Sequence, residues 1–90
     1  MDFEWDFKKA AANEQKHNVT FQEAASIFGD RLAMTFADPD HSGSEQRHLT
    51  FGRSNDNRLL VVSHTNWEDK TRIISARLIN RKERKIYEEG

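Results

Sequence analysis

Apolar residues recur with a helical period in the first third of the chain and with a strand period after it. In the segment 21–28, the helical period places apolar side chains on one face, namely Phe21, Ala24, Ala25 and Phe28. Thr20 and Glu23 form the pattern of a capping box at its start, and Gly29 follows its last residue. The pattern therefore predicts a helix over about residues 21–28.

A strand and another helix are predicted before this segment. Residues 3–5 favour a short strand, and residues 7–17, which contain a run of alanines, favour a helix. Asp6 is a good N-cap, because its carboxylate can accept from the free backbone N–H groups of the first turn. Asn18 tolerates the left-handed conformation that stops helices, so we expect the first helix to end there.

After Gly29 the pattern favours strands separated by polar turns. Residues 32–36 favour a strand before the turn 38–43, and longer strands are predicted at 47–53, 58–65 and 71–77. The strand 58–65 is the most hydrophobic, so we expect it at the centre of the sheet. A helix with a basic wet surface is predicted at about 80–88. The expected order β-α-α-β-β-β-α indicates an α+β domain over residues 1–90, with an antiparallel sheet and helices packed on one face.

Composition is that of a small soluble domain. Ninety residues leave room for one hydrophobic core. The chain has no cysteine, which excludes disulfides and thiolate metal sites and suits a reducing cytoplasm. Its first residues lack the apolar region of a signal peptide, and no apolar run approaches the ~20 residues of a membrane span. We therefore expect a cytoplasmic protein without a membrane segment.

Charge is divided unequally along the chain. Residues 1–46 contain four lysines and arginines against nine acidic residues, whereas residues 47–85 contain ten against four. The two segments therefore carry net charges of −5 and +6. This asymmetry favours a polyanionic ligand or an acidic partner, although two halves that neutralise each other would produce the same pattern.

Several motifs, in order over nearly the whole chain, resemble those of the BrnT (formerly DUF497) toxins. The first is the pattern Phe3-x-Trp5-Asp6-x-x-Lys9-x-x-x-Asn13-x-x-Lys16-His17-x-Val19-x-Phe21. The others are Glu45-x-Arg47 with Gly52-Arg53, then Ser63-His64-Thr65, then Arg72-Ile73-Ile74-Ser75-Ala76-Arg77 with Glu83-Arg84-x-x-Tyr87. Their number and shared order make the resemblance specific.

The resemblance implies a RelE/ParE-like fold and an endoribonuclease toxin that arrests growth without a cofactor or metal. It also implies a BrnA-like antitoxin with a ribbon-helix-helix DNA-binding part. Because such parts dimerise, we expect a heterotetramer of two toxins and two antitoxins.

The chain departs from the family pattern at three places. Phe7 and Asn18 replace the usual Pro and Gly, which are mild structural changes. Asn66-Trp67 stands where many members have Glu-Arg. Trp67 can stack on an RNA base, or the loop has no role. This departure keeps open the alternative of an inactive toxin-fold module that binds its antitoxin. A ParE-like gyrase poison is a second alternative, because the resemblance implies a fold that such toxins share.

Metal-independent RNA cleavage needs a base, an acid and cations that stabilise the phosphorane. His64 is the candidate acid or base, because the pKa of a free histidine lies near 6.5; the alternative is a hydrogen-bonded histidine at a strand end. Arg77, Arg47 and Arg53 are the candidate phosphate ligands. Arg77 could instead pair with Glu83 or Glu45, and the other two could lie on an exposed sheet face.

Secondary candidates for RNA binding are Arg72, Ser75, Trp67 and Tyr87. Tyr87 could stack on a base or pack in the core. Arg72 and Arg77 fall on opposite faces of an unbulged strand, so Arg77 is favoured unless a bulge intervenes. His17 fits a helix C-terminus, where the helix dipole favours its charge. The segment Asp38-x-Asp40-His41 suggests a cation site but reads more simply as a turn.

Overall fold

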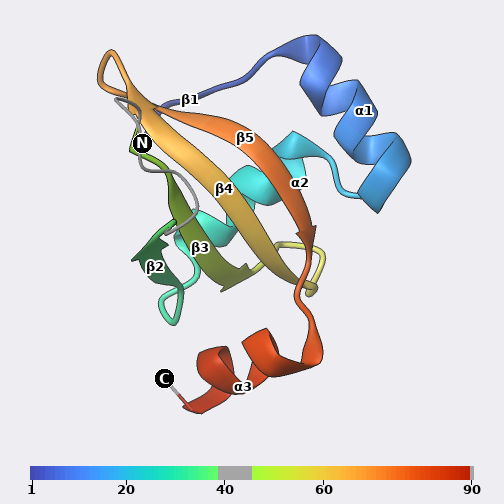
Figure 1. Ribbon diagram of the computed structural model, residues 1–90, viewed down its shortest axis with the longest axis vertical. Helices are drawn as coiled ribbons and strands as arrows, with labels where there is room; N and C mark the ends of the chain where they lie inside the picture. Colours follow the sequence, from blue (N-terminus) through green and yellow to red (C-terminus); the bar gives the residue numbers. More distant parts are fainter. Residues whose placement is uncertain (39–45, 90) are drawn as a thin grey trace.

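The computed structural model describes residues 1–38 and 46–89 and contains a five-stranded sheet with three α-helices (Figure 1). The elements are β1 (Phe3–Glu4), α1 (Phe7–His17), α2 (Phe21–Ser26), the 3₁₀ turn η1 (Ile27–Gly29), β2 (Met34–Ala37), β3 (His48–Arg53), β4 (Leu59–Trp67), β5 (Lys70–Leu78) and α3 (Arg81–Glu89). The α+β class is confirmed. The strand predicted at 32–36 forms as β2 at the edge of the sheet. The observed order is therefore β-α-α-β-β-β-β-α, with one strand more than the order β-α-α-β-β-β-α stated from the sequence.

The sheet has the order β1-β5-β4-β3-β2. Strands β2 to β5 form an antiparallel meander, while β1 pairs in parallel with β5 through Phe3 opposite Thr71 and Glu4 opposite Arg72. The sheet is therefore mixed at one edge, where an antiparallel sheet was predicted. The most hydrophobic strand, β4, lies at its centre as expected.

The first two helices pack on one face of the sheet. Leu60 and Val62 of β4 are fully buried there together with Phe21 and Ile27. The same cluster includes Ile73 of β5, and both helices contact that strand. We call this side the helix-covered face.

The third helix lies on the other side. Its Tyr87 forms a second, smaller core with Phe51, Leu59 and Val61. Leu59 and Val61 alternate with Leu60 and Val62 along β4, so the two clusters lie on opposite faces of the sheet. In Figure 1, α3 stands below the end of β5, apart from α1 and α2. The prediction that the helices share one face holds for α1 and α2 and is wrong for α3.

The residues predicted to begin and end α1, and the one predicted to begin α2, act as caps in the structure. The Asp6 carboxylate accepts from the backbone N–H groups of Lys8 and Lys9 at 2.8 and 3.1 Å, which holds the pKa of Asp6 below its usual value. Asn18 adopts the left-handed conformation with φ of 58°. Thr20 caps α2 by accepting from the N–H of Glu23 at 3.0 Å.

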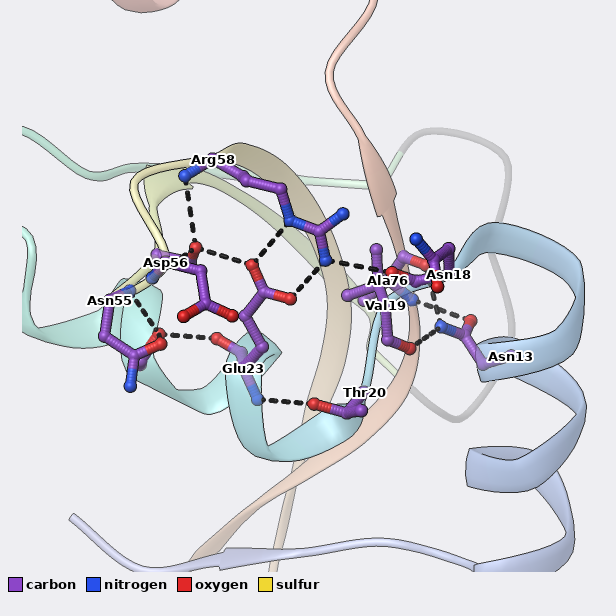
Figure 2. A network of polar contacts seen from close by, with 11 residues as sticks. Asn13, Asn18, Val19, Thr20, Glu23, Asn55, Asp56, Arg58 and Ala76 are labelled. Atoms are coloured by element: carbon purple, nitrogen blue, oxygen red, sulfur yellow. Dashed lines mark hydrogen bonds and ion pairs between the residues drawn. The ribbon is translucent and has the colours of Figure 1, made fainter.

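The Glu23 side chain does not complete a capping box. Its carboxylate is buried, accepts from the Ser54 hydroxyl at 2.7 Å and pairs with the Arg58 guanidinium (Figure 2). Arg58 also donates to the carbonyl of Asn18 at 2.9 Å. The contact with Arg58 lowers the pKa of Glu23. This network fastens the β3–β4 turn to the start of α2.

Asn13 ties α1 to the edge of β5. Its side-chain amide accepts from the Ala76 N–H at 3.0 Å and donates to the Ala76 carbonyl at 2.9 Å and the Val19 carbonyl at 3.0 Å (Figure 2). Because β1 covers β5 only at Thr71 and Arg72, the amide satisfies backbone groups that β1 leaves free.

A β-bulge interrupts the pairing of β4 with β5. Ser75 lies opposite Ser63, but Ile73 lies opposite His64, so Ile74 is the extra residue. The alternation of side chains between the two faces of β5 therefore shifts by one residue at Ile74. As a result, Arg72 lies opposite Thr65 and Arg77 opposite Val61, and both arginines are on the same face. The prediction that these two arginines lie on opposite faces holds only for an unbulged strand, and the bulge places them together.

Candidate functional site

The face opposite α1 and α2 carries a line of polar residues along β5. Arg72, Ser75 and Arg77 lie opposite Thr65, Ser63 and Val61 of β4, which share this side of the sheet. Trp67 of β4 belongs to the same side by alternation. We call this side the arginine face.

Arg77 is held in a fixed geometry at the α3 end of this line. Its two terminal nitrogens donate to the two carboxylate oxygens of Glu83 at 2.8 and 2.7 Å, and Nη1 also donates to the carbonyl of Leu78 at 3.3 Å. The ion pair raises the pKa of Arg77 and lowers that of Glu83. The pairing with Glu83 that sequence analysis left as an alternative is thus formed.

Glu83 also takes part in capping α3, whose N-cap residue is Asn80. The backbone N–H of Asn80 donates to its Oε1 at 3.0 Å, and the Glu83 N–H donates to the Asn80 side chain at 2.8 Å. This is a complete capping box, with the acidic side chain on the third helical residue. The spacing Asn80-x-x-Glu83 is the signal by which sequence reasoning could have found Glu83.

The opposite end of the line carries Arg72 and Trp67. The Arg72 guanidinium lies 5.3 Å from the centre of the Trp67 ring, within the range of a cation–π contact. Arg72 also approaches Glu4 at 3.5 Å. The Trp67 ring is 47% exposed, so it offers a flat apolar surface beside a cation. A nucleobase can stack on such a surface.

Arg47 and Arg53 belong to the same side but to the far part of the sheet. Arg53 pairs with Leu59 in the register of β3 and β4 and is exposed. Its guanidinium donates to the Asn57 side chain at 3.1 Å, which turns it toward the β3–β4 turn. Arg47 precedes β3 and is half-buried. The structure therefore brings Arg72, Ser75, Arg77 and Trp67 together along β4 and β5 and leaves these two arginines at the periphery.

His64 lies on the helix-covered face, away from the arginines. It alternates with Leu60 and Val62, is 8% exposed, and stacks edge-on against the Phe28 ring at 4.9 Å between centroids. Its Nε2 shares a hydrogen bond of 2.7 Å with the Thr50 hydroxyl. Burial, with a smaller contribution from His48, lowers the pKa of His64 to about 4. The side chain is thus a neutral core residue in this geometry.

Tyr87 fills the second core. It is 8% exposed, and its hydroxyl donates to Asp30 at 2.6 Å. Burial and this hydrogen bond raise the pKa of Tyr87. In this arrangement its ring is covered by Phe51 and Val61 and is not presented to a base.

The remaining sequence candidates lie elsewhere. His17 ends α1 beside the edge of β5, where it lines a shallow pocket together with Lys9, Lys16 and Ser75. Asp40 and His41 lie outside the described residues. Among the residues that are described, no three histidine, aspartate or glutamate side chains are placed to hold a metal ion. None of the described helices combines the length and the apolarity that a membrane span requires.

The structure defines the protein as a small α+β domain with an arginine-lined sheet face. The carboxylate in the capping box of α3 pairs with one of those arginines. Comparison with known proteins defines the family. The family model of the ribonuclease toxin BrnT of type II toxin–antitoxin systems matches residues 5–83. The chain therefore belongs to the BrnT family of ribonuclease toxins.

A solved structure agrees with this assignment at the level of the fold. The crystal structure of the Brucella abortus ribonuclease toxin BrnT matches with a TM-score of 0.68 and 20% sequence identity, over 90% of this chain and 99% of that one. No curated protein sequence matches this chain.

Proposed function

We propose that this protein is a metal-independent endoribonuclease that binds RNA along the arginine face and arrests growth by cutting it. The observation that carries the proposal is the bulge at Ile74, which aligns Arg72, Ser75 and Arg77 on one exposed side of β5. Family membership supports ribonuclease activity, and the alignment supports the place where RNA binds.

The chemistry follows from the groups on this face. Arginines are always charged and bind phosphate oxygens through paired N–H donors. Arg77 is the candidate for stabilising the phosphorane that forms when a 2′-hydroxyl attacks the adjacent phosphorus. Ser75 and Arg72 would bind the neighbouring backbone, and Trp67 would stack on a base. Such a reaction needs no metal, because the guanidinium groups supply the positive charge.

His64 has no direct part in this proposal. Its side chain is buried on the opposite face and neutral over most of the physiological range, because its pKa lies near 4. We assign it to the packing of the helix-covered face. Arg47 and Arg53 would contribute long-range attraction to the RNA from the edge of the site.

The partner proposed for this toxin is a BrnA-like antitoxin with a ribbon-helix-helix DNA-binding part. The type II toxin–antitoxin family implies an antitoxin of some kind. An acidic antitoxin segment over the arginine face would block RNA by occupying the same cations. Ribbon-helix-helix dimerisation would then produce a heterotetramer in the cytoplasm, where both RNA and operator DNA are found.

The decisive experiment compares wild type with Arg77→Ala on purified RNA in the presence of EDTA. We expect wild type to cut the RNA and Arg77→Ala to be about 10²–10³-fold slower, as when one transition-state donor is lost. Arg31→Ala, in the exposed turn before β2, is the matched control and should cut normally.

Other outcomes would separate the alternatives. Cleavage that EDTA abolishes would contradict the metal-independent mechanism. Growth arrest with intact RNA and broken DNA would point to a gyrase poison, and the absence of any arrest to a module that binds its antitoxin without cutting.

A further inference from the structure

The proposed reaction needs a base near Arg77, and few groups on that side of the sheet can serve. Arginine cannot give up its proton at neutral pH, and the Tyr87 hydroxyl is buried and already donates to Asp30. Glu4 lies at the far end of the line, beside Arg72. Within residues 1–38 and 46–89, Glu83 is the carboxylate that contacts Arg77 directly.

We propose that Glu83 is the general base that takes the proton from the attacking 2′-hydroxyl of the RNA. This rests on the proposed ribonuclease function and adds a catalytic residue to it. The Glu83 side chain is 16% exposed, so it is largely withdrawn from solvent without being fully buried. The Asn80 N–H and the Arg77 guanidinium hold it at the start of α3.

The pairing leaves Arg77 able to bind phosphate at the same time. A guanidinium has five N–H donors, and three of them serve Glu83 and the Leu78 carbonyl. The Nε–H and the second N–H of Nη2 remain, and they lie side by side on one edge of the group. That edge matches two oxygens of a phosphate. A phosphate bound there would lie one guanidinium width from the Glu83 carboxylate.

This distance suits the reaction, because the attacking 2′-oxygen is bonded to the ribose whose 3′-oxygen carries that phosphate. As the 2′-oxygen–phosphorus bond forms, its proton passes to Glu83 and the bond from phosphorus to the 5′-oxygen breaks. The 5′-oxygen takes a proton from water, leaving a 2′,3′-cyclic phosphate and a 5′-hydroxyl. Glu83 then returns its proton to solvent. The contact with Arg77 lowers the pKa of Glu83, so the carboxylate is ionised at neutral pH.

The test compares Glu83→Gln with Glu88→Gln, a matched change on the same helix at a glutamate that pairs only loosely with Arg84 at 3.7 Å. We expect Glu83→Gln to lower kcat about 10²–10⁴-fold, the usual contribution of a general base, with little change in KM. Glutamine keeps an oxygen that can accept from Arg77 and Asn80 but cannot take up a proton. Glu88→Gln should match wild type.

The pH dependence of cleavage separates a base from a residue that only holds Arg77 in place. Without a protein base the residual reaction should use hydroxide, so log kcat of Glu83→Gln should rise with pH at a slope of about one. Wild type and Glu83→Asp, which keeps a carboxylate, should show a plateau near neutral pH. A slow Glu83→Gln variant with the wild-type pH profile would overturn the proposal, as would one that cuts at the wild-type rate.

The failure of this proposal can be told apart from the failure of the proposed function. If wild type does not cut RNA, the ribonuclease assignment itself is wrong. If Glu83→Gln fails to fold, Glu83→Asp decides, because a conserved plateau with a reduced kcat supports a carboxylate base. Loss of the plateau in Glu83→Asp, or product ends other than cyclic phosphate and 5′-hydroxyl in wild type, would contradict it.

Discussion

The two faces of the central sheet differ in what their polar groups contact. On the helix-covered face, polar side chains such as Asn13 and His64 are buried, and the Asn13 amide and the Nε2 of His64 are hydrogen-bonded to neighbours within the fold. On the arginine face, Ser75 and Trp67 are exposed, and Arg77 retains donors beyond those it uses internally. One strand pair, β4 with β5, supplies both sets. The buried residues and the proposed RNA-binding residues are therefore alternate residues of the same strands.

This separation predicts that substitutions on one face change folding and substitutions on the other change activity. The largest effect should come from Phe21→Ala, because Phe21 is fully buried and packs against Trp5. We expect the free energy of unfolding to fall by about 3–5 kcal/mol. Phe36→Ala on the arginine face, where the ring is 41% exposed, should cost about 1 kcal/mol. Urea unfolding curves of both variants would test this. Equal losses of unfolding free energy in the two variants would contradict the difference between the faces.

The next largest effect is expected at Asn13. Asn13→Ala removes three hydrogen bonds and leaves the buried backbone groups of Ala76 without partners. We expect a loss of about 1–3 kcal/mol in the free energy of unfolding and faster hydrogen exchange at the Ala76 amide. Gln15→Ala, at an exposed position of α1, is the control. An Ala76 amide that exchanges at the wild-type rate would show that the Asn13 contact is not needed.

His64 should make stability fall on acidification. Its folded pKa of about 4 lies below the unfolded value of 6.5, so the unfolded chain takes up the proton first. This stabilisation is complete above pH 6.5 and declines as the pH falls toward 4. At pH 5 the loss amounts to about 2 kcal/mol. The difference in unfolding free energy between pH 7 and pH 5 should shrink in His64→Gln. Folded His64→Gln should still cut RNA, and loss of cleavage would return His64 to the site.

The smallest effect on folding is expected at Trp67. Trp67→Ala should leave the free energy of unfolding within about 0.5 kcal/mol, since the ring is exposed. RNA affinity should weaken about tenfold through the lost base stacking. Fluorescence anisotropy with an RNA whose 2′-hydroxyls are replaced by hydrogen would measure this without cleavage. Unchanged affinity would remove Trp67 from the binding surface.

Much of the fold could be predicted from the sequence because its signals are local. Asp6 and Asn18 mark the ends of α1 through their own side-chain and backbone chemistry. The face on which His64 lies could not be predicted, because Leu59 to Val62 are all apolar and their alternation does not say which side the helices cover. The parallel pairing of β1 depends likewise on contacts distant in sequence.

The candidate site was predicted in its residue types more than in its geometry. Arg77 and Arg72 are candidates by residue type, but their common face depends on the bulge at Ile74, for which β5 carries no distinctive residue. The sequence indicates Glu83 as an ion-pair partner of Arg77. It does not indicate that the same carboxylate also belongs to the capping box of α3, because that depends on how α3 is placed against β5.

The bulge also determines which kinds of mutation β5 can accept. Removing Ile74 would leave Ser75 opposite Ser63 and Ile73 opposite His64, so the strand would alternate regularly. Arg72 and Arg77, then four residues apart, would stay on one face. The part of β4 opposite the bulge has no extra residue, so removing one residue between Ser63 and Thr65 would exchange the two sides of that strand. The length of β4 is therefore more tightly constrained than the length of β5 at its bulge.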